Sequence, residues 1–317
     1  MPGVVPPDGV PRLGVVLPEG EGDMGGRTAR WSDYAAMART AEAMGFDSIW
    51  LPDHLIYLED ATTEPPQGVW ECWSMLAALA AVTERVELAP LVTATGYRNP
   101  ALLAKIADAV DEISGGRLIL AMGSGWQEPE YRAFGFAADH KIGRFEEALT
   151  IVHGLLRDGA IDFDGTYYQA RDCELRPRGP RDGAIPIMVG ANGPRMLRLT
   201  ARFADQWNTW LATGDNTPAD FTPDDAALDA ACLEVGRDPS TLVRTVSLMV
   251  DPAGGSVIPA SMSPVDARPI GGSTEAIADA IRAFGALGVG HVQLYPLPNT
   301  VDGIQALEPV LHALGRA

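Results

Sequence analysis

Asp53 and His54 directly follow a short apolar segment, Ser48–Leu51, and their side chains are suited to chemistry. A histidine exchanges protons near neutral pH, and it can also donate a hydrogen bond to a cofactor ring. The alternative is a loop histidine bound only to backbone, and position alone leaves both interpretations open. We choose His54 as the catalytic candidate because barrel enzymes recruit residues at strand ends.

A second candidate is the end of the apolar segment Glu87–Val92, formed by Leu91, Val92 and Thr93. The residues change there from aliphatic to small and polar. A bend at this point could bring backbone against the face of a ring. The alternative, an ordinary strand end before a helix, is slightly favoured by the sequence alone.

A glycine-rich loop follows the next apolar segment and consists of Gly123, Ser124, Gly125 and Trp126. It is not a Walker loop, because no Gly-Lys-Ser/Thr follows, and no third glycine on a helix completes a dinucleotide fingerprint. Two glycines around a serine let backbone N–H groups approach an anion or a ring, and Trp126 supplies an apolar wall. The alternative is an ordinary turn with a core tryptophan.

A fourth candidate opens a predicted helix after Ile187–Val189 and contains Asn192, Gly193, Pro194 and Arg195. A proline at the first helical position and the free N–H groups of a helix start form a natural anion site. Arg195 adds a permanent positive charge. The alternative is a plain loop between strand and helix.

The remaining titratable residues give weaker signals. His140, His153, His291 and His312 show no metal-ligand spacing, so the sequence predicts no metal site. His140 could face the site, whereas His153 and His312 fit structural positions on helices. Glu128 and Glu130 could act as acids or simply be solvated.

Apolar segments and amphipathic segments alternate along the chain and must position these residues. The expected strands are Leu13–Leu17, Ser48–Leu51, Glu87–Val92, Leu118–Met122, Ile187–Val189, Gln206–Asn208, Val243–Val250 and His291–Tyr295. The expected helices are Ser32–Met44, Glu71–Thr83, Pro100–Ile113, Gly143–Leu156, Pro194–Phe203, Pro223–Val235, Thr274–Leu287 and Val301–Leu314. Eight strand–helix units predict an α/β fold, a closed (β/α)8 TIM barrel.

Three long connections interrupt this pattern: Pro52–Trp70 after strand two, Gly123–Ile142 after strand four, and Arg157–Pro186 before strand five. The first two should build the site, because loops after strands form the active end of such barrels. The third contains a hairpin with Asp164-Gly165 at its turn. With no internal linker, the sequence predicts an N-terminal extension, residues 1–12, and a single domain, residues 13–317.

Composition limits the class of protein. The chain has 317 residues and a formal net charge of −18, which argues against nonspecific binding to nucleic acid or anionic membranes. The three cysteines include no CxxC pair, and no signal-peptide pattern or long apolar run occurs. These features predict a cytoplasmic protein that binds neither nucleic acid nor a membrane.

Three separated segments resemble the bacterial luciferase-like monooxygenase superfamily: RWSDYAAMARTAEAMGFDSIWLPDHL, LVTATGYRNPALLAKIADAVDEISGGRLILAMGSGWQEPEYRAFG and IPIMVGANGPRMLRLTARFADQWN. The pattern is most similar to the branch that depends on coenzyme F420, a deazaflavin hydride carrier. This resemblance implies a TIM barrel, a homodimer and F420-dependent hydride transfer to or from a small organic molecule.

The resemblance also implies roles for the candidate residues. Asp53 and His54 match ring contacts, and Leu91–Thr93 match a bend that carries a non-prolyl cis peptide behind the ring. Gly123–Trp126 and Asn192–Arg195 match contacts to the cofactor tail and phosphate. Sugar-phosphate dehydrogenases of the branch carry a catalytic glutamate at the position of Trp126 and a tryptophan at that of Leu58. Sugar-phosphate oxidation is therefore disfavoured, and the proton donor stays unassigned.

Two other functions remain open. In one, reduced FMN occupies the same site and oxygenates a substrate such as an alkanesulfonate. In the other, the barrel has lost catalysis and binds a ligand. The small residues Gly123, Gly125 and Ala94 disfavour the second.

Overall fold

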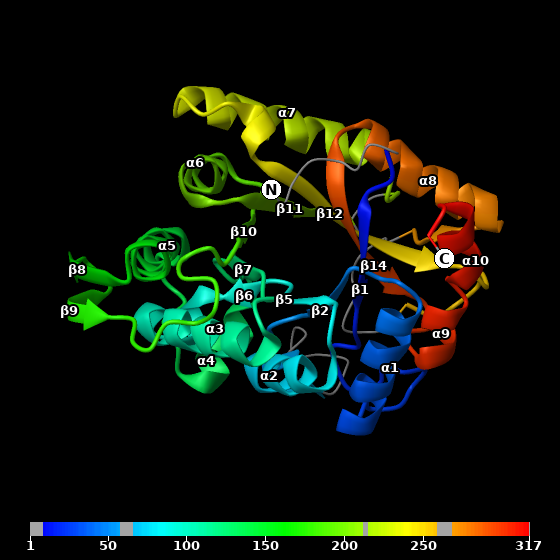
Figure 1. Cartoon of the computed structure of the whole chain (residues 1–317), viewed down its shortest axis with the longest axis horizontal. Helices are drawn as coiled ribbons and strands as arrows, with labels where there is room; N and C mark the ends of the chain where they lie inside the picture. The colour runs from blue at the N-terminus through cyan, green and yellow to red at the C-terminus, as the bar shows by residue number, and fades with distance from the viewer. Residues whose placement is uncertain (1–8, 58–65, 212–214, 259–267, 317) are drawn as a thin grey trace.

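The computed structural model describes residues 9–57, 66–211, 215–258 and 268–316, and its centre is a barrel of parallel strands surrounded by helices (Figure 1). The eight barrel strands are β1 (Arg12–Val16), β2 (Ser48–Leu51), β5 (Glu87–Pro90), β7 (Leu120–Gly123), β10 (Ile187–Gly190), β11 (Gln206–Trp210), β12 (Val243–Asp251) and β14 (Val289–Pro296). The hydrogen-bonded order β5-β2-β1-β14-β12-β11-β10-β7 follows this sequence around the barrel. The predicted fold class is confirmed.

The barrel closes between β5 and β7. Leu88 and Leu118 form a parallel bridge, in which the Ile119 N–H donates to the Leu88 carbonyl at 2.9 Å. The expected strand Glu87–Val92 ends early, at Pro90, and a short strand β6 (Thr93–Ala94) then pairs with β7. The chain therefore bends between β5 and β6, at the point where the family resemblance implies a bend, and not as the ordinary strand end that the sequence alone slightly favours.

Helices cover the outside of the barrel. They are α1 (Trp31–Ala43), α2 (Cys72–Val82), α3 (Pro100–Ser114), α5 (Lys141–Asp158), α6 (Pro194–Phe203), α7 (Pro218–Glu234), α8 (Thr274–Ala286), α9 (Val301–Gln305) and α10 (Glu308–Ala313). The start of α3 shows the predicted local chemistry, because Asn99 Oδ1 accepts from the Ala101 N–H at 2.9 Å just before Pro100.

Two predicted helix boundaries were wrong. Helix α7 begins at Pro218 rather than at Pro223, because Thr217 and Asp220 form a capping box and Pro223 is accommodated inside the helix. The expected helix Val301–Leu314 is two helices, since Pro309 has no N–H to continue the hydrogen bonds of the first.

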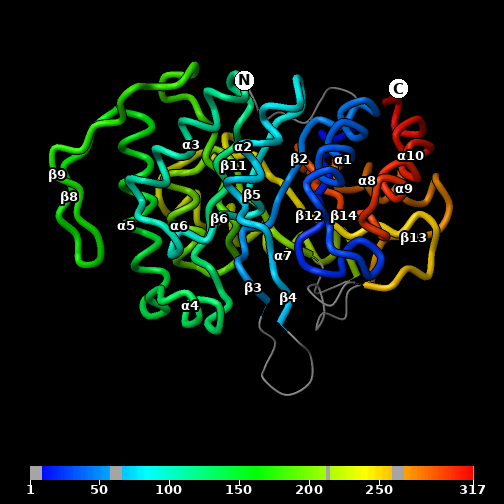
Figure 2. Tube along the Cα trace, turned by 90° about the horizontal axis from the view of Figure 1, so that it is seen from below, coloured from blue at the N-terminus to red at the C-terminus, as the bar shows by residue number. Residues whose placement is uncertain are grey.

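The insertions contain their own elements. A small hairpin, β3 (Ile56–Tyr57) with β4 (Gln67–Gly68), follows β2, and helix α4 (Glu128–Phe134) follows β7. Figure 2 shows both at the same end of the barrel. The predicted hairpin before strand five is confirmed as β8 (Ala160–Asp164) and β9 (Gln169–Glu174), which lie beside α5 (Figures 1 and 2). Leu58 lies outside the described residues.

Two apolar clusters hold these layers together. The larger lies between strands and helices, whereas the smaller fills the barrel interior and contains Trp50, Ala121, Met188, Met249 and Tyr295. Burial of large apolar side chains contributes about 1.5–3 kcal/mol each. Both clusters fix the strand ends from which the candidate residues extend.

Candidate active site

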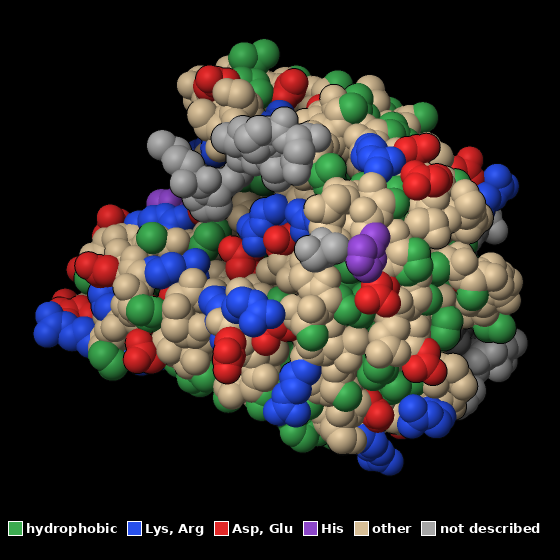
Figure 3. All heavy atoms as spheres, turned by 45° about the vertical axis from the view of Figure 1, so that its right-hand side comes forward, with side chains coloured by type: hydrophobic (Ala, Val, Ile, Leu, Met, Phe, Trp, Pro, Cys, Tyr) green, Lys and Arg blue, Asp and Glu red, His purple; other side chains and the backbone are tan. Residues whose placement is uncertain are grey.

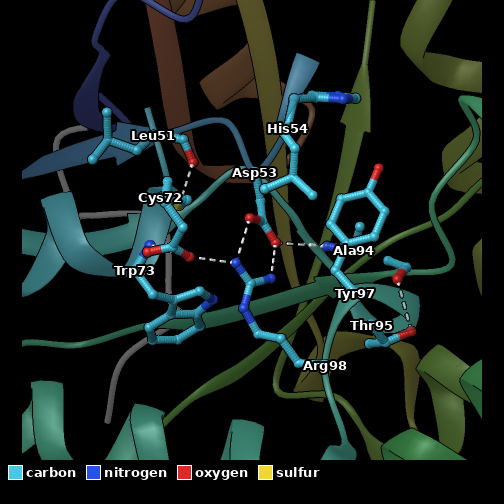
Figure 4. Close-up of polar contacts among 12 residues, drawn as sticks. Leu51, Asp53, His54, Cys72, Trp73, Ala94, Thr95, Tyr97 and Arg98 are labelled. Atoms are coloured by element: carbon cyan, nitrogen blue, oxygen red, sulfur yellow. Dashed lines mark hydrogen bonds and ion pairs between the residues drawn. The ribbon is translucent and has the colours of Figure 1, made fainter. Parts of the chain in front are cut away.

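Asp53 lies at the carboxyl end of β2 and is buried in an ion-pair network (Figure 4). Its carboxylate accepts from Arg98 Nη1 at 2.6 Å, from Arg98 Nη2 at 2.9 Å, and from the Ala94 N–H at 3.1 Å. Arg98 also donates to Glu71, which caps the start of α2. This network joins β2, β6 and α2, and it leaves only the backbone of Asp53 for the predicted cofactor contact.

His54 points away from the Asp53 carboxylate (Figure 4). Its Nδ1 lies 2.9 Å from Glu130 Oε2, and its Nε2 lies 3.8 Å from Glu19 Oε1. Burial disfavours the imidazolium, but the hydrogen bond to Glu130 and the charge of Glu19 outweigh burial and raise the pKa of His54. The side chain is still 14% exposed, so Nε2 is the ring nitrogen available for proton exchange.

Glu130 of α4 anchors this histidine. Its carboxylate is fully buried and accepts hydrogen bonds from the Leu55 and Ile56 N–H groups and from the Tyr97 hydroxyl. Burial alone would raise its pKa, but the hydrogen bonds, with that from His54 foremost, lower it. Glu130 is therefore an ionised support, and not the acid that its position in the sequence allowed.

Glu19 is a site residue that the sequence analysis missed. It follows β1, lies buried beside His54, and accepts a hydrogen bond from the Tyr57 hydroxyl. Burial raises the pKa of Glu19 to about 7, although His54 and Tyr57 act against this shift. The available signal was an acidic segment, Glu19–Asp23, directly after the first barrel strand.

The bend after β5 brings three predicted segments together. The Leu91–Val92 peptide is cis, and the Val92 side chain lies between the ends of β7 and β10. A Cβ added at Gly123 would lie 2.7 Å from Val92 Cγ2, and one at Gly190 would lie 3.2 Å from the same atom. Both positions therefore require glycine, or a shift of Val92, for close packing.

Gly125 and Trp126 complete the loop after β7. Gly125 has φ +71°, and a Cβ there would lie 2.0 Å from the Tyr131 hydroxyl, which donates to the Ser124 carbonyl at 3.1 Å. The glycines thus admit Tyr131 and Val92 against the loop. Trp126 is not a core residue: it is 65% exposed and lies edge-on to His54, with ring centroids 5.7 Å apart.

The loop after β10 reaches the start of α6. Pro194 begins the helix, and no side chain caps its N-terminus, so its first N–H groups face outward. Asn192 and Gly193 are exposed, and Arg195 pairs with Glu146 of α5 at 2.6 Å. The uncapped helix start is compatible with an anion site, and that site stays a prediction.

The other histidines have structural surroundings. His153 contacts Phe203, His312 faces the Glu308 carbonyl, and His291 is buried against Ser48 in the barrel. His140 caps the start of α5 in the left-handed conformation and is 66% exposed. Within the described ranges, no three His, Cys, Asp or Glu side chains are grouped to hold a metal, and no helix is long and apolar enough to cross a bilayer.

Comparison with known proteins decides the family. Residues 12–252 match the luciferase-like monooxygenase family. The chain belongs to this family. The predicted recognition is thereby confirmed, and relatives of the chain are named as a reductase and as a monooxygenase.

Two relatives illustrate the range of this luciferase-like family. A 5,10-methylenetetrahydromethanopterin reductase of Archaeoglobus fulgidus is 31% identical over 215 residues, which is 67% of this chain and 59% of the relative. A pyrimidine monooxygenase RutA of Cronobacter sakazakii is 36% identical over 178 residues, 55% of this chain and 51% of the relative. The chain thus matches little more than half of each relative's length.

Solved structures agree on the fold. The F420-dependent tetrahydromethanopterin reductase of Methanopyrus kandleri superposes with a TM-score of 0.75 at 18% identity, covering 96% of this chain and 99% of that one. An F420-dependent secondary alcohol dehydrogenase with a bound F420–acetone adduct gives 0.77 at 18% identity and the same coverage. At this identity the likeness concerns the luciferase-like barrel alone.

Proposed function

We propose that this luciferase-like protein is a coenzyme F420-dependent oxidoreductase that transfers a hydride to or from a small, uncharged organic substrate. The observation that carries the proposal is the pair His54 and Glu19 beside the bend after β5. Interconversion of an alcohol and a carbonyl moves a proton together with the hydride. A pair that titrates near neutral pH suits that proton.

The residues around the bend fit a flat cofactor. The Thr93 hydroxyl, at the bend, is buried with no hydrogen-bond partner in the described structure. A buried hydroxyl without a partner is costly, and a ring with polar edges would supply one. The ring would lie against Leu91–Thr93, and the start of α6 with Arg195 would hold the phosphate.

When bound, coenzyme F420 would supply the hydride at its deazaflavin ring. The protein supplies the rest of the chemistry. Glu130 fixes the His54 ring through Nδ1 and leaves Nε2 directed toward Glu19. Glu19, with a pKa of about 7, then holds or releases the proton that the substrate oxygen exchanges. We assign proton transfer to His54 and Glu19 together. They would replace the catalytic glutamate that sugar-phosphate dehydrogenases carry at the position of Trp126.

Charge around the site favours an uncharged substrate. Arg98 is already paired with Asp53, and His54 is already paired with Glu130. Glu19 adds a further carboxyl beside His54. An anionic sulfonate or sugar phosphate would meet repulsion, whereas the exposed face of Trp126 suits an apolar surface.

The second candidate is a reduced-flavin monooxygenase. The specific observation in its favour is the 36% identity to pyrimidine monooxygenase RutA, whose name gives an uncharged class of substrate. Its phosphate would take the same place at the start of α6. The acidic surroundings of His54 disfavour the alkanesulfonate version of this chemistry.

A titration with each cofactor tests the proposal. We expect oxidised F420 to bind with micromolar or tighter affinity and FMN to bind at least tenfold more weakly, a free-energy difference of about 1.4 kcal/mol. The readout is quenching of cofactor or tryptophan fluorescence, without turnover. Tight FMN binding without F420 binding would establish the second candidate, and binding of neither would leave a ligand-binding barrel.

We also propose that the protein is a homodimer that pairs through α2 and α3. Helix α2 contains no charged residue, although it lies in the outer layer. Trp70, Leu102 and Ile113 beside it are 49%, 54% and 50% exposed, and such an apolar surface favours a protein partner. Light scattering should give twice the mass of one chain, and Leu102→Glu should give monomers. The predicted reducing, cytoplasmic location stays a prediction.

A further inference from the structure

Tyr57 of β3 lies between the two residues to which proton transfer is assigned. Its hydroxyl donates a hydrogen bond to Glu19 Oε1, the same oxygen that lies 3.8 Å from His54 Nε2. Its ring lies beside the His54 imidazole, with ring centroids 4.6 Å apart and an angle of 33° between the ring planes. One side chain therefore contacts both members of the pair.

The hairpin of β3 and β4 fixes Tyr57 in this place. Tyr57 pairs with Gln67 of β4 and is 7% exposed. Strand β4 is joined in turn to the loop that carries Glu19, because the Glu21 N–H donates to the Gly68 carbonyl at 3.0 Å. The Gly68 N–H also donates to Glu21 Oε2 at 2.8 Å. The hairpin thus connects the loop after β1 with the loop after β2, and it holds Tyr57 against Glu19.

Charges near Glu19 act without the screening that operates at the surface. On the face shown in Figure 3, acidic and basic side chains are interspersed and exposed, so water and salt weaken their interactions. Glu19 is buried, and burial raises its pKa to about 7. His54 and Tyr57 act against this shift, whereas Asp23 and Glu130 add to it. The titratable groups that face Glu19 are Asp23 after β1, Tyr34 of α1, His54 after β2, Tyr57 of β3, Cys72 of α2, Glu130 of α4 and Tyr295 of β14.

We propose that Tyr57 is a positioning residue of the proton-transfer pair: its hydroxyl holds the Glu19 oxygen that faces His54 and stabilises the carboxylate form. This inference rests on the proposed function, which assigns proton transfer to the pair. A phenol donates more strongly to a charged acceptor than to a neutral carboxyl, so the contact favours release of the proton from Glu19. Burial and the neighbouring Glu19 raise the pKa of Tyr57 well above its ordinary value, so the phenol keeps its own proton and stays a donor.

Titration of Glu19 in the full chain, without cofactor, tests this role. The probe is the NMR signal of the Glu19 carboxyl carbon in glutamate-labelled protein, assigned by its disappearance in Glu19→Gln. We expect a wild-type midpoint at a pH of about 7. The midpoint should be about one pH unit higher in Tyr57→Phe, because a hydrogen bond to a charged group is lost. The midpoint of the pH profile of turnover should move in the same direction.

Tyr34→Phe is the matched control. Tyr34 is also buried and faces Glu19, but its hydroxyl donates to the backbone carbonyl of Pro18 at 2.8 Å. The control loses a buried hydroxyl of the same kind and should keep the wild-type midpoint. A ring-fluorinated tyrosine at position 57 is a second variant, which keeps the hydrogen bond. Its more acidic phenol is a stronger donor, so the Glu19 midpoint should fall below that of the wild type.

The outcomes separate this inference from the proposed function. An unchanged midpoint in Tyr57→Phe, or an equal shift in Tyr34→Phe, overturns the role of Tyr57 and leaves the proposed function intact. If Tyr57→Phe does not fold, the fluorinated protein decides, and a midpoint that does not fall overturns the role. A wild type that binds no F420 overturns the proposed function, and Tyr57 is then a structural partner of Glu19 and no more.

Discussion

Asp53 and His54 are neighbours in the chain, yet their side chains belong to two different polar networks. Asp53 faces Arg98, which satisfies both carboxylate oxygens and continues to Glu71. His54 faces Glu130 on one side and Glu19 on the other. In each network two carboxyl groups share one basic side chain, but the basic group is an arginine in the first and a titratable histidine in the second.

The difference between a permanent and a titratable basic group separates support from chemistry. Burial would lower the pKa of Arg98, but Asp53 and Glu71 outweigh burial and raise it, so its charge is permanent. Glu19 faces the titratable His54 and the Tyr57 hydroxyl, but burial outweighs both and raises its pKa to about 7. A group with a fixed charge can hold strands in place, and a group that titrates at working pH can exchange protons.

The largest effect should come from breaking the Asp53 network. Arg98→Met leaves two carboxylates without their cation and should lower the free energy of unfolding by about 3–5 kcal/mol. Arg171→Met breaks an exposed pair and serves as the control, with an expected loss below about 1 kcal/mol. Denaturant unfolding measures both. Equal losses in the two variants would contradict a supporting role for Arg98.

The second effect concerns catalysis. His54→Gln keeps a donor for Glu130 but cannot exchange a proton, so turnover should fall by about 10²–10⁴-fold with little change in cofactor affinity. Tyr97→Phe removes another donor to Glu130 and leaves the histidine in place. Its turnover should fall by less than about tenfold. Steady-state kinetics and cofactor titration test the pair, and a mild His54 phenotype would assign the proton elsewhere.

The third effect is a pH dependence of stability. Folded Glu19 has a pKa of about 7 against 4.5 for its ordinary value, so the folded state binds the proton more tightly. The stabilisation of the folded protein by Glu19 is fully present below pH 4.5 and is lost as pH rises through about 7. In wild type, this loss should lower the free energy of unfolding by about 3 kcal/mol between these pH values, and Glu19→Gln should abolish it. Thermal unfolding at several pH values measures it, and identical slopes in wild type and variant would refute it.

The smallest effect tests the loop that supports the His54 network. Gly125 and Gly135 both have positive φ, +71° and +75°, but only Gly125 has a side chain, Tyr131, against its Cα. Each alanine substitution carries the same backbone cost. Gly125→Ala should be less stable than Gly135→Ala by about 1–3 kcal/mol, the usual cost of overpacking. Similar melting temperatures would show that Tyr131 moves aside freely.

The barrel was predictable because each strand is a short apolar run followed by an amphipathic segment, and this alternation is a local property. The bend at Leu91–Thr93 was implied only by the family resemblance, since the local sequence slightly favoured an ordinary strand end. The boundaries of α7 and of the last helix were wrong, since a capping box and one proline decided them. Trp126 was assigned to an apolar wall, and its 65% exposure fits that role rather than a core position.

The sequence alone determined the fold class and the segments at the strand ends, because these depend on the order and chemistry of neighbouring residues. Only the tertiary structure decided which carboxylates meet His54. Glu19 and Glu130 lie far from it in the chain and come together because β1, β2 and α4 converge at one end of the barrel. Their protonation depends on burial and on distances of a few ångströms, and neither is encoded locally.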